Sequence, residues 1–164
     1  MINIVLLEPE IPGNTGNIGR TCTAVGASLH LIEPRGFRLT EKYLKRAGMD
    51  YWDRLDVHRW KDLEDFMAHH AGANIYYVTT KGKQLYTDVA YEPDCYLMFG
   101  RESSGIPETI LTAHKEACVR IPMADGERSL NLSNAAAIVT YEVLRHWGFP
   151  GLQTEGKPLK TTQW

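Results

Sequence analysis

The chain has 164 residues and a formal net charge of −2, with 43% hydrophobic and 23% charged residues. This length is enough for one domain with its own core, and the composition is that of a globular protein rather than a disordered one. No run approaches the roughly 20 apolar residues of a membrane-spanning helix, and the opening MINIVLLEPE is too short in its apolar part for a secretory signal.

Cysteine and histidine spacing indicates neither a disulfide framework nor a metal site. Cys22, Cys95 and Cys118 are far apart, odd in number and without a CxxC pair. This usage predicts reduced, mostly buried thiols in a cytoplasmic protein. The six histidines form no HExxH or similar spacing, so we expect no metal.

The net charge argues weakly against a nucleic-acid partner, because phosphate binding normally leaves a basic footprint. The distribution of charge matters more than its sum. The stretch RGFRLTEKYLKRAG (35–48) holds a single acid, Glu41. Its basic residues are Arg35, Arg38, Lys42, Lys45 and Arg46. Such a stretch is either a solvated helix face or a patch that contacts phosphates.

Short apolar runs alternate with helical patterns along the chain. In chain order we expect a strand at 3–8, a helix at 15–26, a strand at 28–33, a helix at 39–48, a strand at 55–60, a helix at 61–70, strands at 75–80 and 95–100, a helix at 107–114, a strand at 118–122 and a helix at 133–147. The alternation predicts an α/β fold with a mostly parallel sheet. Ligands of such folds bind beyond the carboxyl ends of the strands, so the loops that follow strands are the candidate sites.

Local residue choices predict where several helices begin and end. Asn14 or Thr15 is the candidate N-cap of the first helix. Thr40 is the candidate N-cap of helix 39–48, and Gly48 its stop. Pro107 suits the first turn of helix 107–114.

The loop PGNTGNIGR (12–20) follows the first strand and opens a helix. Its backbone N–H groups could hold an anion, although the spacing matches neither GxGxxG nor a P-loop. A tight turn that caps the helix would account for Asn14 and Thr15. It does not account for Arg20, which could reach a phosphate with both arms of its guanidinium.

The loop within LMFGRESSGIP (97–107) joins a hydrophobic strand to a helix. Its spacing fails the GxSxG pattern of a serine hydrolase. One interpretation is a loop shaped only by its glycines. The other is backbone packed close to a ligand, because Gly100 and Gly105 flank the acid Glu102.

The junction GERSLNLSNAAA (126–137) crowds small polar side chains before a helix. Ser133 or Asn134 could cap the first-turn amides of helix 133–147. A helix cap alone does not account for four polar side chains, Ser129, Asn131, Ser133 and Asn134.

The three loops, in this order, resemble the three motifs of the SPOUT RNA methyltransferases, a trefoil-knotted class that uses S-adenosylmethionine. The resemblance rests on NTGNIGR, LMFGRESSGIP and IPMADGERSLNLSNAAA and covers about residues 2–150. NIVLLEPEIPGNTGNIGR, RAGMDYW and YLMFG are similar to the branch that methylates the 2′-hydroxyl of the wobble cytidine or uridine of leucine tRNAs.

The resemblance implies a single domain over 1–151 with a C-terminal trefoil knot near 78–82, 100–105 and 121–134. The tail, 152–164, receives no role. The implied cofactor contacts are Val78, Thr79, Phe99, Gly100, Glu102, Gly105, Ile121, Ser129 and Leu130. We expect Glu102 to bond loop amides rather than to act as a base.

The resemblance also implies the catalytic and substrate-binding residues. The catalytic set is Arg20, Ser129 and Asn131, with Asn131 expected to orient Ser129 or the ribose. A guanidinium stays charged in proteins, so we assign Arg20 to phosphate gripping and charge stabilisation rather than to proton abstraction. The predicted substrate contacts are Asn14, Asn17, Arg35, Arg38, Lys42, Lys45, Arg46 and Lys81.

The last helix carries two neighbouring apolar stripes. One holds Val139, Val143 and Trp147, and the other holds Ile138, Tyr141 and Leu144. So broad an apolar surface fits either a fully covered core helix or a helix shared with a second subunit. The resemblance favours a homodimer through this helix and helix 15–26.

Other functions remain open at the level of the sequence. A dinucleotide-binding α/β enzyme lacks its GxGxxG here. A non-catalytic RNA-binding protein of the same fold is disfavoured by the intact Arg20, Ser129 and Asn131. The target could also be another tRNA nucleotide or ribosomal RNA, because RNA is recognised largely by shape and by splayed bases.

Overall fold

A seven-stranded sheet forms the centre of the computed structural model, which describes residues 1–36 and 51–156. The strands are β1 (Ile2–Leu7), β2 (Ser28–Ile32), β3 (Val57–Trp60), β4 (Asn74–Val78), β5 (Gln84–Leu85), β6 (Cys95–Phe99) and β7 (Cys118–Arg120). Their order across the sheet is β3-β2-β1-β6-β4-β7-β5, and every pairing among them is parallel. All carboxyl ends therefore meet at one edge.

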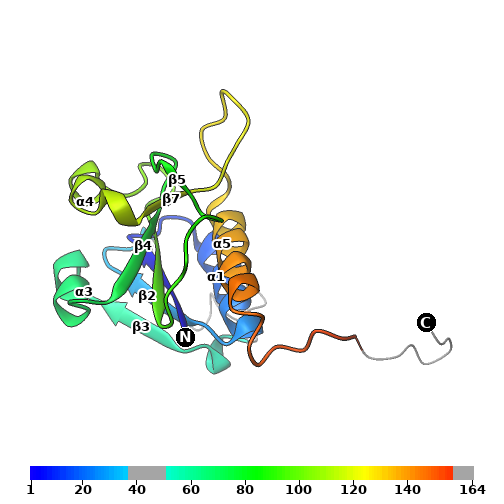
Figure 1. The fold of residues 1–164 in the computed structure, drawn as a ribbon. Coiled ribbons are helices and arrows are strands. Elements are labelled where there is room, and N and C mark those ends of the chain that lie inside the picture. The colour runs from blue at the N-terminus through cyan, green and yellow to red at the C-terminus, as the bar shows by residue number, and fades with distance from the viewer. Residues whose placement is uncertain (37–50, 157–164) are drawn as a thin grey trace.

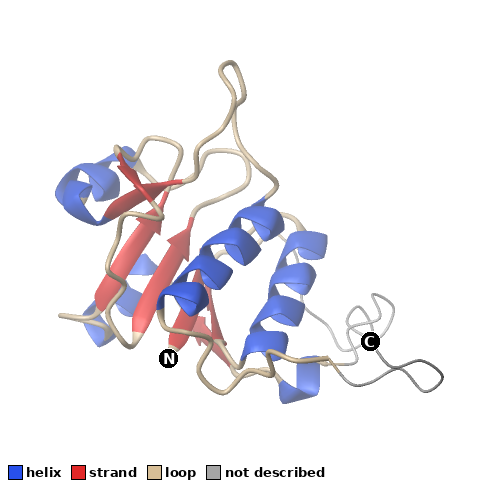
Figure 2. Cartoon of the chain, turned by 45° about the vertical axis from the view of Figure 1, so that its right-hand side comes forward, coloured by secondary structure: helices blue, strands red, loops and turns tan. Residues whose placement is uncertain are grey.

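Helices cover both faces of the sheet (Figure 1). They are α1 (Pro12–Val25), α3 (Leu63–His69), α4 (Glu108–Ala113) and α5 (Leu132–His146), with short 3-10 turns at Trp52–Arg54 and Lys115–Ala117. α1 and α5 lie side by side on one face, as Figure 2 shows, and α3 and α4 lie on the other. In the described part of the chain no helix is long and apolar enough to span a membrane.

Alternating side chains of the central strands explain the two covered faces. Ile4 and Leu6 belong to the core cluster that includes residues of α1 and α5. Val5 and Leu7 belong to the opposite cluster, with Phe66 of α3. Successive residues of a strand point to opposite faces, so a run that is apolar throughout is buried on both.

The α/β architecture and the order of elements agree with the sequence prediction, with boundary shifts of one to three residues. The short strand β5 was not predicted. Its two residues are exposed and pair only with β7, so no apolar run marks it. The predicted helix 39–48, with Thr40 and Gly48, lies outside the described residues.

The first helix begins three residues earlier than predicted, and its predicted caps are wrong. Ile11 is the N-cap of α1, with no side-chain cap bond, and Pro12 occupies the first turn. Asn14 and Thr15 lie inside the helix and are buried. Proline suits this position because its missing N–H has no helical partner there.

The three cysteines are buried and form no disulfide, as predicted. Burial raises the pKa of the Cys22 thiol and of the Cys95 thiol to about 12 in each case. These thiols therefore act as small apolar core residues rather than as nucleophiles.

Candidate cofactor and substrate site

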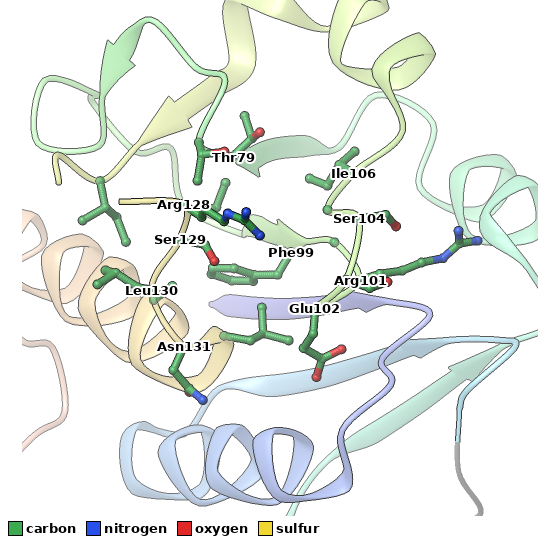
Figure 3. Close-up of a pocket in the computed structure, with 18 of the residues that line it drawn as sticks. Thr79, Phe99, Arg101, Glu102, Ser104, Ile106, Arg128, Ser129, Leu130 and Asn131 are labelled. Atoms are coloured by element: carbon green, nitrogen blue, oxygen red, sulfur yellow. The ribbon is translucent and has the colours of Figure 1, made fainter. Parts of the chain in front are cut away.

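The segments that follow β4, β6 and β7 meet around one pocket at the carboxyl edge of the sheet. Its volume is about 620 Å³, within the range of small-molecule sites. Figure 3 shows that its side chains come from the segment after β4, the loop 100–106 and the segment leading into α5. These are the segments that the family resemblance assigns to the knot.

All nine residues predicted to contact the cofactor line this pocket. So do Asn14, Lys81 and Asn131 from the other predicted sets, whereas Arg20, Asn17 and Arg35 do not. The remaining predicted substrate contacts, Arg38, Lys42, Lys45 and Arg46, lie outside the described residues. That these residues bind cofactor or substrate stays a prediction.

Two glycines let the loop after β6 fold back on itself. A Cβ atom on Gly100 would lie 2.1 Å from the carbonyl carbon of Gly105, so no side chain fits there. Gly105 has a φ of +71°, which L-residues with side chains rarely adopt. Arg101 and Gly105 close the loop by exchanging backbone hydrogen bonds of 2.8 and 3.2 Å.

Glu102 anchors this loop to the start of α1. Its carboxylate accepts hydrogen bonds from the backbone N–H of Glu10 at 2.8 Å and of Ile11 at 3.2 Å. It also accepts one from the side-chain amide of Asn14 at 3.0 Å. A carboxylate at a helix N-terminus complements the helix dipole and the free amides there. The prediction that Glu102 bonds loop amides is confirmed.

Asn14 and Asn131 extend this contact to the start of α5. The Asn131 side-chain nitrogen donates to the Asn14 side-chain oxygen at 3.0 Å. The carboxylate of Glu102 can only accept, so the nitrogen of Asn14 must face it and the oxygen of Asn14 must face Asn131. One chain of hydrogen bonds therefore fixes both amide orientations and joins all three motif loops.

Asn131, rather than Ser133 or Asn134, caps α5. Its side-chain oxygen accepts from the backbone N–H groups of Ser133 at 2.9 Å and of Asn134 at 3.4 Å, and from the Ser133 hydroxyl at 2.7 Å. Both ends of the Asn131 amide are thus engaged away from Ser129. No hydrogen bond joins Asn131 to Ser129 in the described part of the chain, and that Asn131 orients Ser129 or the ribose stays a prediction.

A second set of polar contacts ties the segment after β1 to the same loop. Glu8 pairs with Arg101. Glu10 accepts from the backbone N–H of Ser103 at 2.8 Å and from its hydroxyl at 2.9 Å. These bonds to Ser103 are the main reason that the pKa of Glu10 lies below its usual value. These contacts therefore hold the segment after β1 and the loop after β6 together.

Arg20 lies on the exposed side of α1, outside the pocket. Its guanidinium carbon is 4.9 Å from the centre of the Tyr51 ring, a cation–π distance. The Tyr51 hydroxyl in turn donates to the carbonyl of Gly16. Tyr51 therefore links Arg20 to the first turns of α1.

Two other predicted substrate contacts are ion-paired within the chain. Lys81 pairs with Glu108 at the pocket rim. Arg35 is largely buried and pairs with Glu33 at 2.6 Å. Arg35 does not line the pocket, and its role as a substrate contact stays a prediction.

Sequence reasoning missed several pocket residues. They are Ile11, Thr80, Arg101, Ser103, Ser104, Ile106, Met123, Arg128, Leu132 and Ala135. Most are neighbours in sequence of a predicted residue, and the motif context of Arg128, directly before Ser129, was the signal available for it.

The fold and pocket together define a parallel α/β protein that can hold a small ligand at the carboxyl ends of its strands. The chain belongs to the family described as SpoU rRNA Methylase, whose model matches residues 1–141. A relative from Escherichia coli K12 named tRNA (cytidine(34)-2'-O)-methyltransferase is 47% identical over 152 residues, covering 92% of this chain and 97% of the relative.

Solved structures share the fold. One, described as giving insight into the 2-OH methylation of C/U34 on tRNA, has a TM-score of 0.84 and 38% identity, and covers 90% of this chain and 97% of its own. An AdoMet-bound rRNA methyltransferase from Sinorhizobium meliloti has a TM-score of 0.77 and 30% identity, with coverage of 88% of this chain and 56% of that one. The predicted fold class, the α/β knot class of these methyltransferases, is confirmed.

Proposed function

We propose that this chain is an S-adenosylmethionine-dependent tRNA 2′-O-ribose methyltransferase that acts on the wobble cytidine or uridine of leucine tRNAs in the cytoplasm. The observation that carries the proposal is that the nine residues that the family resemblance marks as cofactor contacts line one pocket. The name of the E. coli relative supports the position of the target nucleotide.

The pocket residues fit the cofactor. Val78, Phe99 and Ile121 give it an apolar floor where three strands end. The backbone N–H groups of Ser129 and Leu130 make no hydrogen bond within the described part of the chain, which leaves them for a ligand. When bound, S-adenosylmethionine supplies an electrophilic methyl group for transfer.

The task of the protein is then to align a ribose hydroxyl with that methyl group and to manage its proton. Ser129 lines the pocket and can relay the proton to a phosphate oxygen of the substrate. Arg20 would hold the neighbouring phosphate with its guanidinium and stabilise the negative charge that develops on the ribose oxygen. Asn131 acts as a positioning residue through Asn14 and the α5 cap.

We also propose a homodimer through the outer faces of α1 and α5. Ile138 and Tyr141 are large apolar residues of α5 that are 38% and 48% exposed. Arg20 lies on the exposed side of α1 and outside the pocket of its own chain. An interface over these helices would cover the apolar side chains and surround Arg20 with a second subunit.

The test of the proposed function is methyl transfer from labelled S-adenosylmethionine to unmodified leucine tRNA transcripts, with the label mapped by nuclease digestion. We expect label on the wobble ribose, and loss of about 100-fold or more in rate for Arg20→Ala, because oxyanion stabilisation and positioning are both removed. Arg54→Ala, an exposed arginine outside the pocket, is the matched control.

The outcomes separate the parts of the proposal. Label on another tRNA nucleotide, or only on ribosomal RNA, would correct the substrate and keep the chemistry. Cofactor binding by calorimetry without any labelled RNA would favour a non-catalytic RNA-binding protein. Near-normal turnover of Arg20→Lys would contradict a two-armed phosphate grip, since lysine lacks the fork.

A further inference from the structure

The charged residues that line the pocket differ in how they are neutralised. Lys81, Arg101, Glu102 and Arg128 are the charged lining residues in the described part of the chain. Lys81 pairs with Glu108, and Arg101 pairs with Glu8. Glu102 accepts three hydrogen bonds from the start of α1.

Arg128 stands apart from these three. Within residues 1–36 and 51–156 it has no ion pair and no hydrogen bond, and it lies in an exposed stretch of the segment before α5. Figure 3 shows its side chain directed into the pocket near Ser129 and Phe99, whereas the side chain of Arg101 points away.

The surroundings of Arg128 present donors rather than competing carboxylates. The hydroxyls of Thr79, Ser104 and Ser129 line the same pocket. The acid that also lines it, Glu102, points toward α1 and is bound there. A guanidinium among hydroxyl groups, with no acid paired to it, suits an oxyanion that offers two oxygens for two parallel hydrogen bonds.

We propose that Arg128 is the oxyanion-binding residue of this pocket. The oxyanion is either the carboxylate of the cofactor or a phosphate of the RNA, so the inference rests on the proposed function. Both groups present two oxygens to one guanidinium, and one residue substitution tests both.

The first measurement titrates S-adenosylmethionine and its decarboxylated analogue into wild-type protein and Arg128→Gln by calorimetry. If the cofactor carboxylate is the oxyanion, Arg128→Gln weakens S-adenosylmethionine binding by about 10-fold or more, as expected for loss of a charge-assisted hydrogen bond. The variant then no longer distinguishes the cofactor from the decarboxylated analogue. Arg59→Gln, an exposed arginine of β3 outside the pocket, should bind like wild type.

The second measurement follows the affinity for a leucine tRNA transcript across a salt series. If a phosphate is the oxyanion, Arg128→Gln reduces the slope of log affinity against log salt by about 0.7 to 0.9, the value of one phosphate contact. Arg128→Lys should keep the slope, because it keeps the charge, and should bind less tightly. Thermal unfolding checks that each variant is folded.

Unchanged cofactor affinity together with an unchanged salt slope in a folded Arg128→Gln protein overturns the inference and leaves the proposed function standing. If the wild type binds neither S-adenosylmethionine nor the leucine tRNA transcript, the proposed function is overturned, and the inference with it. Neither measurement depends on turnover, so a loss of activity alone cannot imitate the expected result.

Discussion

His30 is a titratable side chain that lies buried in the sheet and stays uncharged. It is 3% exposed on β2. The indole N–H of Trp60 donates to its Nδ1 at 3.1 Å, so Nε2 holds the proton and donates to the Asn3 side-chain oxygen at 3.3 Å. Burial, followed by the nearby His58 and His70, lowers the pKa of His30 to about 3.

The consequence is a stability that falls in acid. The unfolded imidazole binds a proton below its usual pKa of about 6.5, while the folded one stays neutral to a pKa of about 3. The contribution of neutral His30 is therefore fully present above about pH 6.5. It is lost progressively as the pH falls toward 3, by about 1.4 kcal/mol per pH unit.

We expect His30→Gln to flatten this dependence. Urea unfolding of wild type and variant at pH 7.5 and pH 5.0 measures it, and the difference between the two proteins removes the shared contribution of other groups such as Asp56. The variant loses stability at pH 7.5, because its amide cannot reproduce the aromatic stacking of His30 on His58, whose ring centres are 4.6 Å apart. An equal loss of stability in both proteins between the two pH values would contradict the assignment to His30.

At the scale of elements, the start of α5 depends on one side chain with two functions. The oxygen of Asn131 caps the helix, and its nitrogen holds Asn14 of α1. The sequence predicted the bounds of the helix to within one residue but did not identify the residue that caps it. Asn131, Ser133 and Asn134 all have side chains that can cap a helix. Only the position of Asn14, supplied by a distant part of the chain, decides among them.

Two substitutions separate the functions of Asn131. Asn131→Ala removes both and should lower the free energy of unfolding by about 0.5–2 kcal/mol for the cap alone. Asn131→Asp keeps an accepting cap at the positive end of the helix and removes only the donor to Asn14. Urea unfolding should therefore place the Asp variant between wild type and the Ala variant, and equal destabilisation of the two variants would show that the cap contributes little.

At the scale of the whole molecule, α5 has one side buried in the core and one side exposed. The inner residues of α5 are buried in the core, which fits the alternative of a covered core helix for that side. Its outer side still exposes Ile138 and Tyr141. The described residues therefore cover only one side of the helix, and a homodimer through the other side stays a proposal.

We expect Ile138→Glu to convert a dimer into a monomer, because an interface must then bury an unpaired charge, at a cost of several kcal/mol. Leu85→Glu on the edge strand β5 is the control, since Leu85 has a similar exposure of 39% and lies on neither α1 nor α5. Sedimentation of both variants and wild type measures the mass. A wild-type monomer, or a dimer that survives Ile138→Glu, would count against this interface.

The sequence by itself determined the α/β class, the order of nearly all elements and the loops that form the pocket. Short apolar runs such as the one within 3–8 favour a strand covered on both faces, and strand ends in a parallel sheet gather at one edge. The motif resemblance then identified nine pocket residues that no local pattern marks as neighbours.

Tertiary structure alone decided what each polar side chain in those loops does. Asn14 lies 88 residues from Glu102 and 117 residues from Asn131 in the sequence. The hydrogen bonds that join these three side chains therefore have no local signature. The same holds for Arg128, which points into the pocket, whereas the pairing of Arg35 with Glu33, two residues away, is a local contact. Propensity and periodicity act over a few residues, whereas the partner of a polar group is chosen by whichever segment the fold brings within hydrogen-bonding distance.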